Sequence, residues 1–312
     1  MKTVVTGAAG FIGSHVAESL VRDGHEVVGI DCFTDYYPCP VKEENLRSLR
    51  ASPRFRLVEG RLQDLDLASL LDGAEHVYHL AAQAGVRTSW GREFSHYTDH
   101  NVLATQRLLE AAVAAGRPTV VYASSSSVYG AAPDLPLRED GPCHPISPYG
   151  VTKLAGEHLA VLYQRNHGLP TVSLRFFTVY GPRQRPDMAF HRFLRAARDG
   201  ETVTVFGDGL QTRDFTYVAD IVAAVRQAPL SGRHGSVYNV GGGERVALNE
   251  VLRVVESVTA RVLRVQHGEA QKGDMRDTFA DTTAARRDLG FRSTVPLAEG
   301  LAREWEWIRG AR

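Results

Sequence analysis

Tyr149 and Lys153 stand four residues apart in Ser-Pro-Tyr-Gly-Val-Thr-Lys-Leu, which covers residues 147–154. Side chains at positions i and i+4 of a helix lie on one face, so the phenol and the ammonium can address the same point. A neighbouring cation favours the phenolate and lowers a phenol pKa that is ordinarily near ~10. The pair therefore predicts a tyrosine that acts as a base near neutral pH. Because the same spacing also arises on ordinary helix surfaces, the prediction depends on two further stretches.

A glycine-rich turn near the N-terminus is the first of these stretches. Gly7-Ala-Ala-Gly10-Phe-Ile-Gly13 lies between an expected strand and an expected helix. Small residues there allow a tight turn, bring backbone amides close to a pyrophosphate and let the helix pack on the strand. The N-terminus of the helix adds a favourable field for an anion. The turn predicts a dinucleotide site, and an α/β domain without a nucleotide is the structural alternative.

Asp31 closes the second expected strand and indicates which dinucleotide binds. Its carboxylate can accept hydrogen bonds from both hydroxyls of the adenosine ribose, whereas a 2′-phosphate would meet like charge. No arginine or lysine immediately follows Asp31. We therefore expect NAD as the cofactor and not NADP.

Strand and helix patterns alternate through the first part of the chain. Strands are expected at residues 4–6, 26–31, 55–59, 76–80, 119–123 and 172–176, and helices at residues 11–22, 65–71, 101–115 and 148–166. Strands that are apolar on both faces and alternate with helices favour a parallel sheet covered on two sides. The predicted fold class is therefore α/β, with a doubly wound parallel sheet of the Rossmann type.

The alternation loosens after residue 177. Helices are expected at residues 189–197, 220–228, 248–259, 283–289 and 297–308, and short strands at residues 203–206, 237–240 and 262–265. No repeat or linker separates the two parts. We expect an NAD-binding domain over residues 1–176, with return segments near 214–230. A smaller, interleaved α/β domain over residues 177–312 is expected to bind mainly the substrate, and Asp220 is expected to cap a helix.

The composition excludes several classes of protein. The 312 residues are 43% hydrophobic and 23% charged with zero net charge, so nothing indicates a nucleic acid or an anionic membrane as a partner. Cys32, Cys39 and Cys143 lack the spacing of a disulfide framework or a zinc site. The histidines lack ligand spacing, so no metal is expected. Without a signal peptide or an apolar run of membrane length, the expected location is the cytoplasm.

Together these motifs resemble the short-chain dehydrogenase superfamily, and best its extended branch of NAD-dependent sugar-nucleotide epimerases and dehydratases. His79-Leu-Ala-Ala, Asn101-Val and Ala123-Ser-Ser-Ser-Ser-Val-Tyr-Gly carry the resemblance further. Gly60-Arg61-Leu62 departs from the family's Gly-Asp-Ile/Leu, which leaves adenine recognition open. The resemblance implies cofactor-binding residues at Gly7, Gly10, Phe11, Ile12, Gly13, Asp31, Leu80, Ala81, Ala82, Asn101, Tyr149 and Lys153.

The resemblance also implies a mechanism in which Ser125 is the catalytic serine beside Tyr149 and Lys153. Ser125 hydrogen-bonds the 4-oxygen of a sugar nucleotide while Tyr149 takes its proton and C4 passes a hydride to the nicotinamide. Lys153 also bonds the nicotinamide ribose. The 4-keto sugar turns over and receives the hydride on its other face, so NAD is regenerated and is expected to stay tightly bound. Dehydratases of similar sequence carry Asp-Glu where this chain has Ser126 and Ser127, so 4,6-dehydration lacks its acid and base.

The segment from Arg175 to Met188 is the most informative about the substrate. Its Phe-Thr-Val-Tyr-Gly-Pro and Arg-Pro-Asp-Met combinations resemble UDP-glucuronate 4-epimerases, as do Gly85-Val-Arg87 and residues 31–37. Oxidation at C4 of a uronic acid leaves a ketone β to the C6 carboxylate, which invites loss of carbon dioxide unless the carboxylate is held. The candidates for holding it are neutral donors and one arginine, whose fork matches a carboxylate. They are Ser126, Ser127, Thr178 and Arg185.

Three more arginines are candidates for the nucleotide-sugar end. Arg213, in Gly207-Asp-Gly-Leu-Gln-Thr-Arg, and Arg276, in Gly273-Asp-Met-Arg, resemble family arginines that meet the diphosphate. Arg87 is a candidate cation near the sugar. Surface salt bridges are the alternative interpretation for each of them.

The expected activity is conversion of UDP-glucuronate to UDP-galacturonate with the carboxylate retained. Two related alternatives are a UDP-glucose/galactose 4-epimerase and a UDP-glucuronate decarboxylase. A dinucleotide-sensing regulator without turnover is the alternative from another class. Relatives commonly pair through the helices expected here at residues 101–115 and 148–166, so a homodimer is expected by analogy.

Overall fold

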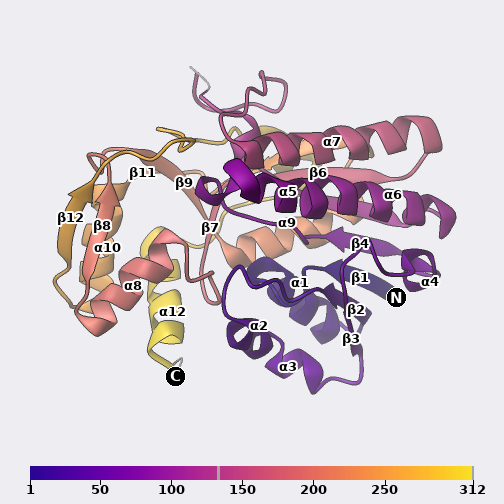
Figure 1. Cartoon of the computed structure of the whole chain (residues 1–312), viewed down its shortest axis with the longest axis horizontal. Coiled ribbons are helices and arrows are strands. Elements are labelled where there is room, and N and C mark those ends of the chain that lie inside the picture. Colours follow the sequence, from indigo (N-terminus) through magenta and orange to yellow (C-terminus); the bar gives the residue numbers. More distant parts are fainter. Residues whose placement is uncertain (132–133, 311–312) are drawn as a thin grey trace.

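A parallel sheet of seven strands forms the centre of the computed structural model, which describes residues 1–131 and 134–310 (Figure 1). The strands lie in the order β10-β6-β5-β4-β1-β2-β3, and every neighbouring pair is parallel. Their bounds are β1 Lys2–Thr6, β2 Glu26–Asp31, β3 Phe55–Glu59, β4 His76–His79, β5 Thr119–Ser125, β6 Thr171–Phe176 and β10 Ser236–Val240. The strand order reverses between β1 and β4, which is the point where doubly wound sheets bind nucleotides. The predicted fold class is confirmed.

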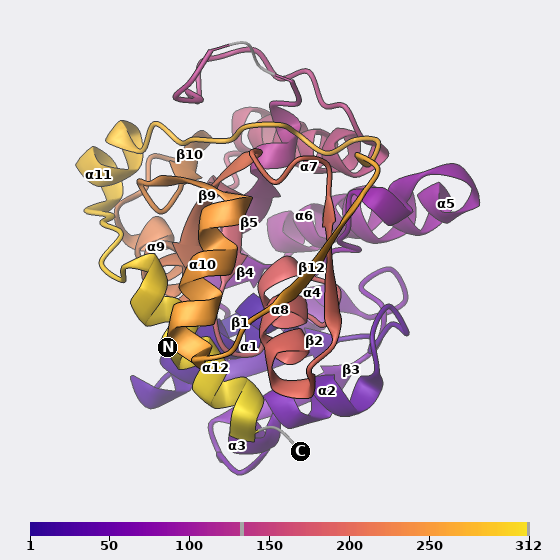
Figure 2. The same ribbon diagram turned by 90° about the vertical axis from the view of Figure 1, so that its left-hand side faces the viewer.

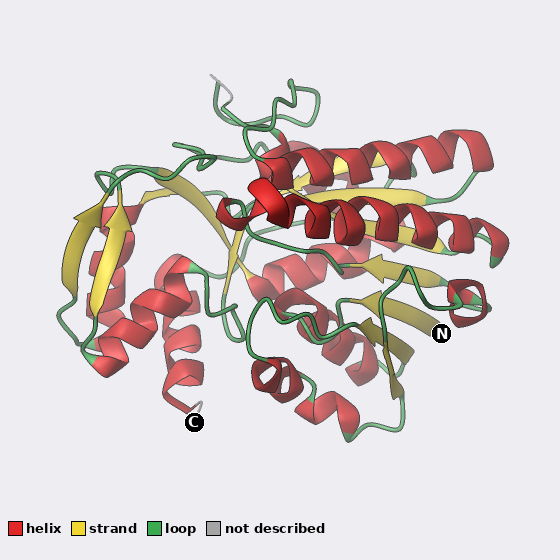
Figure 3. Ribbon diagram, viewed as in Figure 1, coloured by secondary structure: helices red, strands yellow, loops and turns green. Residues whose placement is uncertain are grey.

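Helices cover both faces of this sheet (Figures 1 and 3). One face packs on α1 Phe11–Arg22 and α9 Val218–Ser231, and the other on α4 Leu67–Leu71, α6 Ala104–Ala114 and α7 Pro148–His167. Successive side chains of β1 point to opposite faces of the sheet, because Val5 belongs to the apolar cluster on one face and Val4 to the cluster on the other. Both side chains are fully buried, as expected for a central parallel strand.

The second part of the molecule contains two small sheets and a group of helices (Figure 2). The strands β11 Arg245–Ala247, β9 Thr212–Tyr217 and β7 Thr178–Tyr180 form one sheet, and β12 Arg264–Gly268 and β8 Thr202–Phe206 form the other. The helices are α8 Ala189–Asp199, α10 Leu248–Thr259 and α12 Leu297–Gly310. Helix α10 contacts both α8 and α12.

The two parts interleave along the chain. After β7, β8 and β9, helix α9 returns to the large sheet, and β10 then pairs with β6 through Val240 and Phe176. The return therefore includes β10 as well as α9, and α11 Thr283–Leu289 contacts both of them.

Several elements differ from the sequence-based expectation. Helix α6 is preceded by a π-helical turn, Thr98–Leu103, so Asn101 lies in that turn and not in a regular α-helix. The elements α2 Cys39–Asn45, α3 Arg47–Arg50, α5 Phe94–Tyr97, β7, β9 and β11 were not expected, and β12 begins two residues later than predicted.

The prediction that Asp220 caps a helix is wrong. Helix α9 begins at Val218, so Asp220 lies inside its first turn. Its carboxylate accepts hydrogen bonds from the Thr294 hydroxyl at 2.7 Å and the Thr294 N–H at 3.1 Å. Asp220 therefore ties α9 to the segment before α12. None of the helices within residues 1–131 and 134–310 combines the length and the apolarity needed to cross a membrane.

Candidate active site

The glycine-rich turn connects the carboxyl end of β1 to α1 and leaves no room for a side chain at Gly7 or Gly13. A Cβ on Gly13 would lie 2.0 Å from the Gly7 carbonyl oxygen. Gly7 has a φ of +71°, and a Cβ there would lie 2.8 Å from the backbone nitrogen of Ala81. No side chain caps the N-terminus of α1 at Gly10. The N–H groups of the first helical turn are therefore available to an anion.

Asp31 holds this turn against the end of β2. Its Oδ2 accepts the Ala9 N–H at 3.0 Å, and its Oδ1 accepts the Phe33 N–H at 2.9 Å. Each carboxylate oxygen has a second acceptor position, so the group can still accept hydrogen bonds from ribose hydroxyls. Asp31 thus shapes the turn and remains able to bind a ribose.

A cavity begins at this turn and runs along the carboxyl ends of the central strands. It is lined by the predicted cofactor residues Gly7, Gly10, Phe11, Ile12, Gly13, Asp31, Leu80, Ala81, Ala82, Tyr149 and Lys153. Asn101 lies behind the wall of the cavity. Its Oδ1 accepts the Gln83 N–H at 2.7 Å and its Nδ2 donates to the Gln83 carbonyl at 3.0 Å. Asn101 therefore fixes the loop after β4.

The position of the family's adenine-binding aspartate is arranged differently in this chain. Arg61 forms an ion pair with Asp99 at 2.6 Å. Gly60, Leu62 and Gln63 line the cavity there. The sequence interpretation named Gly60 and Leu62 as part of the departure from the family pattern, but it did not name Gln63. The Gln63 amide donates to the Asp99 carbonyl at 2.7 Å. The departure at Arg61-Leu62 was the only signal for these residues.

Tyr149 and the serine run meet where β5 ends and α7 begins. The Ser147 hydroxyl accepts the Gly150 N–H at 3.1 Å and so caps α7, which places Tyr149 in the first turn of the helix. Ser125 ends β5, and its hydroxyl accepts the Ser127 N–H at 3.1 Å. A Cβ on Gly150 would lie 2.5 Å from the Ser127 carbonyl oxygen. The glycine after Tyr149 therefore allows α7 to pack directly on the serine turn.

The pKa of Tyr149 differs from the expectation, and burial also shifts the pKa of Lys153. Burial raises the pKa of Tyr149, while the nearby Ser125 hydroxyl and the charge of Arg185 lower it. Burial also lowers the pKa of Lys153 to about 8, against the charge of Glu157, which raises it. The Lys153 ammonium lies over the Tyr122 ring, 4.8 Å from the ring centroid. The expected lowering of the Tyr149 pKa by Lys153 is wrong for this arrangement, because loss of phenolate solvation outweighs the nearby charges.

A second cavity meets the first one at Tyr149. Among the predicted residues, it is lined by Arg87, Ser125, Ser126, Ser127, Thr178 and Arg185. Tyr36, Tyr149 and Arg185 line both cavities. The structure therefore brings the phenol, the serine turn and one arginine to a single junction.

Arg213 and Arg276 lie beside the second cavity and outside its lining. Arg213 donates from Nη1 to the Arg276 carbonyl at 2.8 Å, and Arg276 pairs with Asp208 at 3.1 Å. Arg87 pairs with Asp274 at 2.6 Å. Burial lowers the pKa of Arg213, and the positive charge of Arg87 adds to this effect. The three predicted arginines therefore gather near one end of the second cavity.

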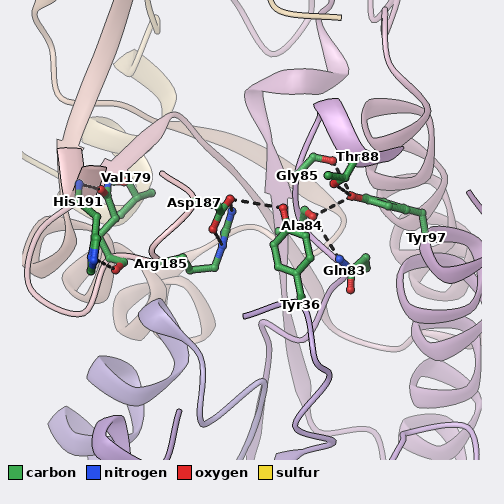
Figure 4. Close-up of polar contacts among 11 residues, drawn as sticks. Tyr36, Gln83, Ala84, Gly85, Thr88, Tyr97, Val179, Arg185, Asp187 and His191 are labelled. Atoms are coloured by element: carbon green, nitrogen blue, oxygen red, sulfur yellow. Dashed lines mark hydrogen bonds and ion pairs between the residues drawn. The ribbon is translucent and has the colours of Figure 1, made fainter. Parts of the chain in front are cut away.

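Arg185 belongs to a cluster that also contains Asp187 and Tyr36 (Figure 4). Its Nε and Nη2 donate to the two Asp187 oxygens at 3.0 Å and 2.9 Å. The Tyr36 hydroxyl donates to Asp187 Oδ2 at 3.4 Å. Sequence reasoning missed both partners, and the only signal for Asp187 was its place in the Arg-Pro-Asp-Met segment.

A second cluster in Figure 4 fixes the loop after β4 next to this site. The Tyr97 hydroxyl donates to the carbonyls of Ala84 at 2.9 Å and Gly85 at 2.8 Å. The Tyr97 ring stands edge-on to the Tyr149 ring, 6.2 Å between centroids. In the part of the chain that the structure describes, no group of three or more His, Cys, Asp or Glu side chains could hold a metal ion.

Comparison with known proteins gives the family of this chain and several similar proteins. The chain belongs to the NAD dependent epimerase/dehydratase family, which matches residues 3–241, as the motifs predicted. A UDP-glucuronic acid 4-epimerase from Bacillus cereus, solved with UDP-glucuronic acid and NAD, is 42% identical, with a TM-score of 0.96 and 99% of both chains covered. A probable UDP-glucuronate 4-epimerase from Rhizobium meliloti (strain 1021) is 38% identical, over 98% of this chain and 96% of its own. MoeE5, solved with NAD and either UDP-glucuronic acid or UDP-glucose, is 45% identical, with 99% of both chains covered and TM-scores of 0.90 and 0.89.

Proposed function

We propose that the protein is an NAD-dependent epimerase that inverts C4 of UDP-glucuronate and gives UDP-galacturonate. The observation that carries the proposal is the junction at which Tyr149, the serine turn and Arg185 face one pocket beside the dinucleotide cavity. The Bacillus cereus relative with UDP-glucuronic acid and NAD supports both the substrate and the cofactor.

The first cavity fits NAD. The turn without room for a Cβ at Gly13, the uncapped N-terminus of α1 and the Asp31 carboxylate are the groups that a pyrophosphate and a ribose require. NAD held by these groups would supply the acceptor for a hydride from C4 of the sugar and, once reduced, the donor that returns the hydride to the opposite face of the ring.

The chain's own residues handle the proton at O4. Tyr149 takes this proton as the general base, and Ser125 hydrogen-bonds O4 and stabilises the phenolate. Arg185 favours the same ionised form through its charge. The pKa of Lys153 is about 8, so its ammonium is mostly charged at neutral pH and supplies a cation on the cofactor side.

The remaining polar residues hold the substrate. Thr178, Ser126, Ser127 and Arg185 bind the C6 carboxylate and keep its bond to the ring out of line with the C4 carbonyl. Arg87, Arg213 and Arg276 bind the diphosphate and the adjoining sugar. In this assignment residues 1–176, with the return segments near 214–230, bind the cofactor, and residues 177–312 mainly bind the nucleotide sugar.

An exposed apolar surface supports a homodimer. Leu103, Val151 and Leu162 are exposed, with 41%, 48% and 52% of their surfaces accessible. They lie on the turn before α6 and on α7, next to a groove lined by Val102 and Leu159. Pairing of these helices between two copies would bury the surface. The cytoplasmic location and the absence of nucleic-acid or membrane partners stay predictions from composition.

A neutral-hexose 4-epimerase is the second candidate, because MoeE5 has been solved with UDP-glucose as well as UDP-glucuronic acid. Incubation with UDP-glucuronate and, separately, UDP-glucose, followed by NMR identification of the products, tests the proposal. We expect UDP-galacturonate from the first substrate. UDP-pentose would instead indicate a decarboxylase, and UDP-galactose alone a neutral-sugar epimerase. NAD binding without any product would indicate a dinucleotide-sensing regulator.

A further inference from the structure

The Arg185 guanidinium has two hydrogen-bonding edges, and Asp187 occupies one of them (Figure 4). The contacts of 3.0 Å and 2.9 Å use the Nε–Nη2 edge. The Nη1–Nη2 edge retains its own N–H groups. Within residues 1–131 and 134–310, Arg185 makes no other side-chain hydrogen bond. One edge is therefore anchored, and the other remains for a ligand in the cavities that Arg185 lines.

Tyr36 holds Asp187 in place from the cofactor side of the molecule. Its hydroxyl donates to Asp187 Oδ2 at 3.4 Å, and the Arg185 guanidinium lies over its ring, 5.7 Å from the centroid. Tyr36 follows β2 and also contacts the loop after β4, where a Cβ on Gly85 would lie 2.3 Å from the phenol oxygen. Three distant segments therefore meet at one phenol, which restrains the Asp187 carboxylate.

We propose that Asp187 is a positioning residue that determines specificity for an acidic sugar. By holding the Nε–Nη2 edge, it presents the other edge of Arg185 to the C6 carboxylate of the substrate. The inference rests on the proposed function, in which Arg185 binds that carboxylate. An arginine fork that is oriented before the ligand arrives loses less side-chain freedom on binding.

The negative charge of Asp187 does not cancel this effect. A carboxylate on the free edge of Arg185 is separated from Asp187 by the guanidinium itself. Attraction to the guanidinium acts at hydrogen-bond distance, whereas repulsion from Asp187 acts across the whole group and is weaker. Loss of Asp187 relieves this weaker repulsion, but it also frees the Arg185 guanidinium to turn away from the cavity. Recognition of an acidic sugar therefore weakens, and a neutral sugar is nearly unaffected.

Binding measurements on the NAD-loaded protein test this inference. Calorimetric titration with UDP-glucuronate and with UDP-glucose gives the ratio of the two affinities for each variant. In Asp187→Asn we expect about a tenfold loss of affinity for UDP-glucuronate and less than about a twofold change for UDP-glucose. In Tyr36→Phe we expect a smaller loss, about twofold and again confined to UDP-glucuronate. A general structural role would change both affinities together.

The chain contains a matched control. Arg138 and Asp140 have the same sequence spacing and the same contact pattern, with Nε–Oδ1 at 3.0 Å and Nη2–Oδ2 at 3.2 Å. This pair is largely exposed to solvent and lines neither cavity. Asp140→Asn is expected to leave both affinities unchanged.

The outcomes separate the inference from the proposed function. If the wild-type protein makes UDP-galacturonate and Asp187→Asn keeps its preference for UDP-glucuronate, only the role of Asp187 is overturned. Equal losses for both nucleotide sugars overturn it as well. If the wild-type protein shows no preference for UDP-glucuronate and makes no UDP-galacturonate, the proposed function and the inference are both wrong.

Discussion

The two cavities that meet at Tyr149 are constructed differently. The cofactor cavity is formed by the ends of neighbouring strands and by backbone, as at Gly7 and Gly13, where no side chain fits. The sugar cavity is formed by side chains from segments far apart in the sequence. Ion pairs such as Arg87 with Asp274, at 2.6 Å, hold these segments together.

We call the residues around the cofactor cavity the cofactor half of the site and those around the sugar cavity the sugar half. The difference in construction indicates which amino-acid changes should damage each half. At the backbone turn of the cofactor cavity, an added Cβ is the most damaging change, because Gly7 and Gly13 have no room for one. A cavity made of paired side chains is sensitive to the loss of a charge, because the partner is left without compensation. Backbone changes should therefore remove the cofactor, and charge changes should alter the choice of substrate.

The largest effect is expected at the border between the cavities. Tyr149→Phe removes the general base without changing the shape of either cavity, so turnover should fall by about 10²–10⁴-fold while NAD stays bound. The rate with UDP-glucuronate and the NAD released on denaturation are the two measurements. Tyr163→Phe on the same helix is the matched control, because the Tyr163 hydroxyl contacts Glu110 and Gln106 and lines neither cavity. An undiminished rate in Tyr149→Phe would exclude the mechanism.

A smaller effect, confined to the cofactor half, is expected for Gly13→Ala. The new Cβ would lie 2.0 Å from the Gly7 carbonyl oxygen, so the turn must shift. We expect a destabilisation of about 1–3 kcal/mol and loss of bound NAD. Thermal unfolding and the cofactor content of the purified protein measure these effects.

Gly10→Ala is the graded control for this prediction. A Cβ on Gly10 would lie 3.1 Å from the same carbonyl oxygen, and Gly10 has a negative φ of −76°. Its effects on stability and cofactor content should be smaller. Equal behaviour of the two variants, or full retention of NAD by Gly13→Ala, would contradict the view that the close backbone approach at Gly13 is needed for the cofactor cavity.

The difference in construction between the two cavities also explains which parts of the fold and the site could be predicted from the sequence. Helix α1 begins at Phe11 and ends at Arg22, and β2 ends at Asp31, as expected from local pattern alone. Glycine spacing and apolar strands are short-range signals, and they specify the cofactor half. The junction at Tyr149 followed from two such signals, at the end of β5 and the start of α7.

The sugar half depends on contacts that no local pattern contains. Tyr36 and Asp187 are 151 residues apart in sequence. Strands β7 and β11 have three residues each, and both pair with β9, so pairing between distant segments defines this sheet. The pKa of Tyr149 was misjudged for a related reason, since burial is a property of the folded chain and not of the Tyr-x-x-x-Lys spacing.

The smallest effect is expected at Glu304, which tests how the sugar half is held together. This residue of α12 is fully buried, and its Oε2 accepts the Gly181 N–H at 2.9 Å. Its Oε1 has no partner among the described residues. Gly181 precedes the turn that carries Arg185. Burial raises the pKa of Glu304 well above its ordinary value of 4.5, so the folded protein holds a proton that the unfolded chain releases above that pH.

The sign of the pH dependence follows from this difference in proton binding. Between the unfolded and the folded pKa of Glu304, the native state binds more protons, so the free energy of unfolding falls as pH rises. A glutamine at this position has a carbonyl oxygen that can accept the Gly181 N–H. Its NH₂ group is a donor, as is the hydroxyl of the protonated acid, but the amide does not titrate. As the pH rises above 4.5, Glu304→Gln should therefore lose less of its free energy of unfolding than the wild type, by a margin that grows with pH. Urea unfolding at several pH values measures it.

Glu306→Gln on the same helix is the control, because the Glu306 side chain is 68% exposed and contacts only Arg309 among the described residues. It should follow the wild-type pH dependence throughout. If Glu304→Gln also followed it, the Glu304 carboxylate would have to be ionised in the folded protein. The turn that carries Arg185 would then rest on a buried charge without a partner, and side-chain complementarity could not explain how the sugar half is held together.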